Sequence, residues 1–159
     1  PLEEIMFFIC IPYACVFTYY ALEKLQPHFK VSIFLSNIVS WLLLLLFIVL
    51  AIFNSDKMYT FVNSAMAFLV LLFTFIREKT LLQRFFPIYI LLLIPFFMVN
   101  GILTGSFIHQ EIVWYNDAEN LRIRIGTIPI EDAMYAFSLI LMNVTLAALF
   151  NKKRIPQSL

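Results

Sequence analysis

Long apolar runs separated by short polar segments dominate the chain. The runs cover residues 1–22, 34–53, 58–76, 85–104 and 129–150. Each is close to the ~20 residues that a helix needs to cross about 30 Å of hydrocarbon. The pattern therefore predicts an all-α fold, a polytopic transmembrane helix bundle with at least five spans. Because the connections are short, we expect consecutive helices to lie antiparallel.

Composition supports this interpretation. Hydrophobic residues make up 62% of the chain, charged residues make up 13%, and the mean hydropathy is +0.90. Soluble domains carry about 25% charged residues. The chain is therefore expected to be an integral membrane protein. It begins at Pro1 with no basic segment or signal-peptide pattern ahead of the first apolar run, so we interpret it as truncated at the N-terminus.

An acidic motif occurs twice, each time at the start of an apolar run. The first copy is Pro1-Leu2-Glu3-Glu4 and the second is Pro129-Ile130-Glu131-Asp132, and both continue with a methionine and an aromatic ring at the same offsets. A proline in the first helical position followed by acids is also a common helix start, because the helix dipole favours carboxylates there. Two copies with matched flanks favour a function. They predict an internal pseudo-repeat whose halves share one polar centre.

Basic residues are distributed unevenly between the two sides of the predicted bundle. Only Lys57, Arg122 and Arg124 fall on one side, and the other eight of the eleven lysines and arginines fall on the opposite side. By the positive-inside rule the richer side is cytoplasmic. Both acidic motifs are then expected to lie toward the non-cytoplasmic side.

Prolines and charges divide the spans into two kinds. Pro12, Pro87 and Pro95 lie inside apolar runs, where prolines kink helices and can open a cavity. Spans 34–53 and 58–76 contain no charged residue inside their runs. These two spans are therefore expected to be lipid-facing scaffold.

The segment 105–128 alternates polar and aromatic residues and leads directly into the second motif. It is expected to be either an interfacial cap or lid over the site, or an ordinary Trp/Tyr belt with a solvated loop. Asn100 and Thr104 lie one turn apart just before it, on the side of the acids. Asn100 is expected either to join two helices by a hydrogen bond or to orient a carboxyl group. Tyr135 follows the second motif and is a further supporting candidate.

Several chemistries can be set aside. The chain has three glycines, which form neither a dinucleotide fingerprint nor a phosphate-binding loop, so we expect no flavin or nicotinamide cofactor. The two histidines lie in loops on opposite sides, which argues against a histidine metal site. The sequence has no stripe of basic and aromatic residues of the kind that binds nucleic acid. Acid-base chemistry in an apolar environment remains, with Glu3, Glu4, Glu131 and Asp132 as the candidate catalytic groups.

Three stretches together resemble the lycopene cyclase domain family, the membrane-integral type that occurs as paired small subunits or fused halves. They are PLEEIMFFICIPYACVFTYY, IPFFMVNGILTGSF and IVWYNDAENLRIRIGTIPIEDAMYAF. The resemblance runs from Pro1 to about Phe150. It implies that residues 1–22 are the last helix of a first repeat. Residues 34–150 are then the second repeat, which ends in the motif helix 129–150.

The resemblance implies an isomerase, an intramolecular lyase of carotenoid biosynthesis that works without a cofactor. A carboxylic acid protonates the end of lycopene, the chain folds into a ring, and a base removes a proton to leave a β-ionone ring, as in β-carotene. Glu3 and Glu131 are expected to be the principal pair, and Glu4 and Asp132 to tune them or act as base. Aromatic ring faces can stabilise the cation.

The resemblance also implies partners and a location. The partners are the linear carotenoid, the lipid bilayer, and the first-half helices, supplied in the same chain or by a partner subunit. The expected location is a bacterial inner or plasma membrane.

Two other functions remain open at this point. A membrane prenyl-chain cyclase or transferase would bind diphosphates through Asp-rich, Mg²⁺-binding segments, and the closest match in this chain is the segment 116–120. A proton-coupled transporter or carotenoid-binding subunit would use the carboxyls as proton relays or helix anchors. The depth of the carboxyl groups in the membrane distinguishes a transporter from a cyclase. Acids of transporters usually lie near the bilayer centre, whereas the acids of this chain lie at the starts of helices.

Overall fold

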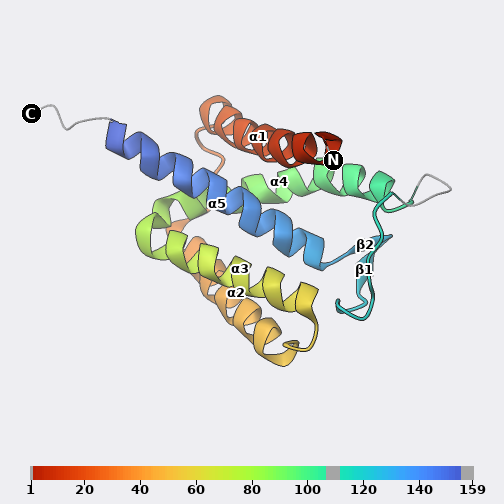
Figure 1. Ribbon diagram of the computed structural model, residues 1–159. Coiled ribbons are helices and arrows are strands. Elements are labelled where there is room, and N and C mark those ends of the chain that lie inside the picture. Colours follow the sequence, from red (N-terminus) through yellow and green to blue (C-terminus); the bar gives the residue numbers. More distant parts are fainter. Residues whose placement is uncertain (1, 107–111, 155–159) are drawn as a thin grey trace, which may run out of the picture.

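The computed structural model describes residues 2–106 and 112–154, without the side chains of residues 2–4, 7–8 and 152–154. The five helices in this part are α1 (Leu2–Leu25), α2 (Ile33–Phe53), α3 (Met58–Arg77), α4 (Lys79–Leu103) and α5 (Glu131–Arg154). A short hairpin of β1 (Arg124–Ile125) and β2 (Ile128–Pro129) lies between α4 and α5 (Figure 1). The expected all-α class is confirmed, with this hairpin as an addition.

Four of these helices are long and apolar enough to cross a membrane: α2, α3, α4 and α5 up to Asn151. The fourth helix begins at Lys79, earlier than the expected start at residue 85, so Pro87 lies well inside it. The first expected span coincides with α1. Because some of its side chains lie outside the described part, a fifth span stays a prediction.

Helix α3 lies between α2 and α5, and its small and apolar side chains fill the centre of the bundle (Figure 1). Ala67 and Leu71 are fully buried there. Polar groups on the same helix are buried too: Thr60, Ser64 and Thr74 have almost no exposed surface, and Thr74 shares a hydrogen bond of 2.9 Å with Thr145 of α5. The prediction that span 58–76 is lipid-facing scaffold is therefore wrong for this face, while the opposite face is apolar and exposed. The span has no charged residue, but its uncharged polar side chains form a face that packs on α5.

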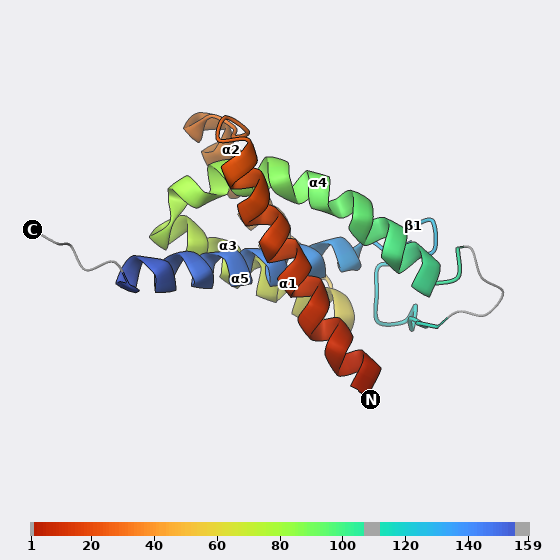
Figure 2. The ribbon, with the colours of Figure 1, turned by 90° about the horizontal axis from the view of Figure 1, so that it is seen from above.

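The other face of α5 is covered by α1 and α4. Seen from above, α1 crosses obliquely over α5, and α4 runs toward the hairpin (Figure 2). Aromatic rings join the two neighbouring helices, since Phe137 of α5 makes edge contacts with Phe85 and Tyr89 of α4 at centroid distances of 5.4 and 5.2 Å. Aromatic contacts of this kind add about 0.5–1.5 kcal/mol beyond the area they bury.

The start of α5 differs from the expected helix start. Pro129 lies in β2, where it is paired with Arg124, and the helix begins two residues later at Glu131. Gly126 sits in the two-residue turn of the hairpin with φ of 64°, a conformation that glycine adopts at little cost. The interpretation of Pro129 as the first helical residue is wrong, because the hairpin holds it in extended backbone. The two acids do lie in the first turn.

Candidate active site

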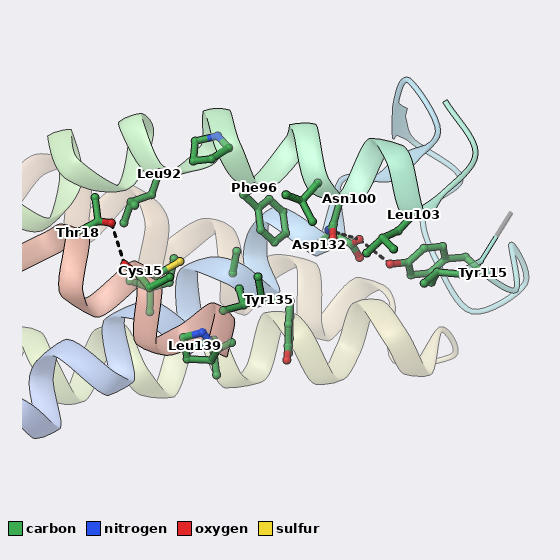
Figure 3. Close-up of a pocket in the computed structure, with 18 of the residues that line it drawn as sticks. Cys15, Thr18, Leu92, Phe96, Asn100, Leu103, Tyr115, Asp132, Tyr135 and Leu139 are labelled. Carbon is green, nitrogen blue, oxygen red and sulfur yellow. Dashed lines mark hydrogen bonds between the residues drawn. The ribbon is translucent and has the colours of Figure 1, made fainter. Parts of the chain in front are cut away.

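Asp132 has three neutral hydrogen-bond donors around its buried carboxylate. Oδ1 accepts a hydrogen bond of 2.5 Å from the hydroxyl of Tyr59. Oδ2 accepts one of 2.6 Å from the hydroxyl of Tyr115 and one of 3.2 Å from Nδ2 of Asn100 (Figure 3). The residue is only 2% exposed. Helix α3, helix α4 and the loop before the hairpin thus each supply one donor to the start of α5.

Glu131 lies beside it and is fully buried, but its surroundings differ. Oε1 accepts hydrogen bonds from the hydroxyl of Thr60 at 2.7 Å and from the backbone N–H of Leu121 at 2.6 Å. Oε2 has no hydrogen-bond partner among the described residues. A buried polar atom without a partner costs free energy, so such atoms often belong to functional sites.

An apolar cavity of about 600 Å³ opens beside Asp132. Helices α1, α4 and α5 form its walls, and two of the three mid-helix prolines, Pro12 and Pro95, line it. In the close-up, Phe96 and Leu139 lie along the cavity, with Asp132 and Tyr115 at one end (Figure 3). Among the described residues, Asp132 is the one carboxyl group in the lining, while Glu131 lies behind it.

The loop before the hairpin turns one aromatic residue inward and its neighbour outward. Tyr115 contacts Asp132, and its ring lies 5.8 Å from that of Tyr59 between centroids. Burial raises the pKa of the Tyr115 hydroxyl above its ordinary value, so the group stays protonated and can keep donating. Trp114 is 77% exposed. The loop therefore combines features of both expectations, a cover over the site and an outward-facing aromatic residue.

The supporting residues expected from the sequence lie at different distances from the acids. Asn100 contacts Asp132 directly, in agreement with a role in orienting a carboxyl group. Tyr135 lines the cavity. Thr104 contacts neither acid; its hydroxyl bonds the carbonyl of Asn100 at 2.8 Å and the hydroxyl of Thr127 at 2.6 Å. The side chains of Glu3 and Glu4 lie outside the described residues, so their roles stay predictions.

Three side-chain contacts of the site were not expected from the sequence, those of Tyr59, Thr60 and Tyr115. Tyr59 and Thr60 lie in the first turn of α3, which was expected to be uncharged scaffold. Tyr115 was expected to be one of several interfacial aromatic residues. A signal did exist for the first two, since two adjacent hydroxyl residues lie near the start of this mainly apolar run, at the end on the side of the acids. Polar groups at such positions have to find partners within the bundle.

The arrangement suits proton exchange with an apolar molecule. The carboxyl group of Asp132 borders the cavity, and neutral donors hold both of its oxygens by hydrogen bonds. A tyrosine hydroxyl can donate or accept a hydrogen bond, so the cluster can remain in place in either protonation state of the acid. A carboxyl group so placed can come within hydrogen-bond reach of a molecule in the cavity, as general acid or base catalysis requires.

Residues 56–150 match a family model described as lycopene cyclase, which covers more than half of the chain. The matched range includes both acids of the second motif and, in the described part, every residue that donates a hydrogen bond to their carboxyl groups. No curated protein and no solved structure matches the chain.

Proposed function

We propose, from the premise that this chain belongs to the lycopene cyclase family, that it catalyses the redox-neutral cyclisation of a linear carotenoid end group to a β-ionone-type ring. Family membership and the four apolar helices support a carotenoid substrate and a membrane protein. The observation that carries the finer proposal is the single described carboxyl group in the wall of an apolar cavity, that of Asp132.

The reaction consists of one proton gained and one proton lost. The terminal double bond of the carotenoid uses its electron pair to bind a proton from a carboxylic acid, which leaves a tertiary cation. An internal double bond attacks that cation and closes the ring. A base then removes a ring proton, and the electrons of that C–H bond form the ring double bond. Substrate and product are isomers, so no electron carrier takes part.

Within the second motif we assign proton exchange with the substrate to Asp132. Glu131 has no surface on the cavity and contacts Thr60 and the backbone of Leu121, which suits a residue that holds the start of α5 in position. This assignment reverses the order expected from the motif alignment, in which Glu131 is the principal carboxyl. The reversal rests on access, because an acid must come within hydrogen-bond reach of the group it protonates.

The cationic intermediate requires stabilisation that an apolar cavity alone does not give. The rings of Tyr59 and Tyr115 adjoin Asp132 and also line the cavity. Ring faces attract cations by ~0.5–2 kcal/mol, and more where water is excluded. We assign this role to the two tyrosines, with Tyr135 and Phe96 farther along the wall.

The first motif completes the proposal. We propose that α1 is the motif helix of a first repeat and that Glu3 or Glu4 supplies the second carboxyl group of the acid-base pair. The contact of α1 with the cavity through Ile11, Pro12 and Cys15 supports this role. We further propose that this end of the bundle faces the non-cytoplasmic side of the membrane.

The proposal is tested by isotope incorporation. Membranes that contain the protein are supplied with unlabelled lycopene in D₂O buffer, and the extracted pigments are analysed by mass spectrometry. We expect a cyclic product that carries one added deuterium for each ring, without added flavin or nicotinamide. Membranes without the protein are the control. Unchanged lycopene from well-expressed protein would contradict the proposal and favour the transporter or carotenoid-binding function.

A further inference from the structure

The segment 116–120, the closest match to an Asp-rich diphosphate motif, contacts the N-terminus of α3. The side chain of Glu119 accepts a hydrogen bond of 2.9 Å from the backbone N–H of Met58. Its backbone carbonyl accepts two more, from the N–H groups of Tyr59 at 3.1 Å and Thr60 at 3.3 Å. The first N–H groups of a helix have no partner inside the helix, and Lys57 at the N-cap makes no side-chain cap bond. Glu119 therefore caps α3 from a distant part of the chain.

The capped turn carries two of the donors of the candidate site. The hydroxyl of Tyr59 bonds Asp132, and the hydroxyl of Thr60 bonds Glu131. Two residues after Glu119, the backbone N–H of Leu121 bonds Glu131 as well. Any displacement of Glu119 would therefore shift donors to both acids at once.

A network of charged and polar groups fixes this segment to the hairpin. Arg124 bonds Asp117 Oδ1 at 2.5 Å and the carbonyl of Thr127 at 2.9 Å. The buried side chain of Asn120 bonds Asp117 at 3.3 Å and accepts the backbone N–H of Arg122 at 2.8 Å. The hairpin leads directly into α5. The segment is thus joined both to the start of α3 and to the strand that precedes the acids.

We propose that Glu119 is a positioning residue for the cyclisation, one that sets the distance between the hydroxyls of α3 and the two acids of α5. This inference rests on the proposed function. Glu119 does not line the cavity. Its side chain bonds the N–H of Met58, the residue directly before Tyr59 and Thr60, so it acts through the first turn of α3. Small displacements of catalytic groups lower reaction rates steeply. Loss of this cap is therefore expected to lower the rate of cyclisation, whereas loss of a cap far from the site would affect stability alone.

The test compares Glu119→Ala, Glu119→Gln and Asp56→Ala in membranes supplied with lycopene. The glutamine variant retains an oxygen that can accept the Met58 N–H, and Asp56 is an exposed acid in the turn before α3. We expect Glu119→Ala to lower kcat about tenfold with little change in KM, and to alter the pH profile. Glu119→Gln is expected to recover most of the rate, and Asp56→Ala to resemble the wild type. Rates are expressed per amount of folded protein, measured by fluorescence-detected size-exclusion chromatography.

A double-mutant cycle with Tyr59→Phe separates positioning from simple capping. Residues that act through one another give less than additive losses, so we expect the double variant to be little slower than the slower single variant. A Glu119→Ala protein that is less stable but turns over at the wild-type rate with an unchanged pH profile would overturn the inference, as would fully additive losses. An inactive wild type would overturn the proposed function and this role with it, whereas an active wild type with equally active Glu119→Ala overturns this role alone.

Discussion

The two aspartates on either side of the hairpin have opposite surroundings. Asp117 is exposed and bonds the guanidinium of Arg124, whose hydrogen bond lowers the pKa of that carboxyl below its ordinary value. Asp132 is buried and bonds two tyrosine hydroxyls and an amide. A permanent charge keeps its partner ionised and so suits a structural brace. Neutral hydroxyls permit a proton to come and go.

The comparison indicates how a single loop can serve two purposes. Its outer face uses an ion pair, that of Asp117 and Arg124, which holds the geometry of the loop and does not line the cavity. Its inner face uses groups without net charge, next to an apolar cavity. Within the described residues, no ion pair involves Asp132 or Glu131. The two acids of the candidate site are thereby separated from the charged groups that hold the loop in place.

The largest effect is expected from Asp132→Asn, which retains the size of the side chain and removes the exchangeable proton. We expect the rate of cyclisation to fall ~100-fold or more, the usual contribution of a general acid or base. Pigments from lycopene-accumulating cells give the measurement. Asp117→Asn is the matched control and should keep most of the activity. If Asp132→Asn still makes cyclic product at the wild-type rate, the distinction between the two aspartates fails.

Glu131→Gln sharpens the assignment within the motif. Because Glu131 lies behind Asp132, we expect a loss of about tenfold through misplacement of the start of α5, clearly less than for Asp132→Asn. The ratio of the two variants' rates, measured in the same membranes, is the relevant number. An inactive Glu131→Gln beside an active Asp132→Asn would restore Glu131 as the principal carboxyl.

A smaller effect is expected from Tyr115→Phe, which removes one of the three donors to Asp132. We expect the rate to fall about fivefold, which corresponds to about 1 kcal/mol, the usual net contribution of one hydrogen bond. Since burial raises the pKa of this hydroxyl, it remains protonated through the neutral and mildly alkaline range. Ionisation of this hydroxyl should therefore add no separate alkaline step to the ratio of the wild-type and variant rates across that range. A loss confined to alkaline pH would contradict this account.

The smallest effect concerns the stability of the brace. The pKa of Asp117 is lowered from its ordinary value of 3.8, so the stabilisation it gives is present above that value and is lost as the pH falls through the lowered folded pKa. We expect Asp117→Asn to lower the Tm slightly at neutral pH. The difference from the wild type should vanish in strong acid. A difference that grows as the pH falls would contradict the pairing with Arg124.

Long apolar runs made the helices predictable. Asn100 was correctly expected near the acids, because it lies at the end of its run on their side of the bundle. The same reasoning failed for α3, because hydroxyl groups count little in hydropathy and yet decide which face is buried. It also missed the hairpin. Two-residue strands leave no periodic pattern, and Pro129 is equally suited to a helix start.

The candidate site was only partly predictable for a related reason. Adjacent acids in an apolar sequence are easily recognised as candidate site residues. The choice between Glu131 and Asp132, however, depends on which of them faces the cavity. That direction is fixed by donors from three separate segments, one of them Tyr115 in an irregular loop. The cap of α3 by Glu119 joins residues far apart in the sequence, and no local pattern announces such a contact.

The buried polar face of α3 has a consequence for biosynthesis. Thr60 and Thr74 find partners on α5, which is made only after α4 and the loop have left the ribosome. A newly inserted α3 therefore presents the Thr60 hydroxyl without its partner until α5 arrives, whereas the Thr74 hydroxyl can bond the Val70 carbonyl of its own helix. A nascent chain that stops before residue 131 would leave this face of α3 without its partner.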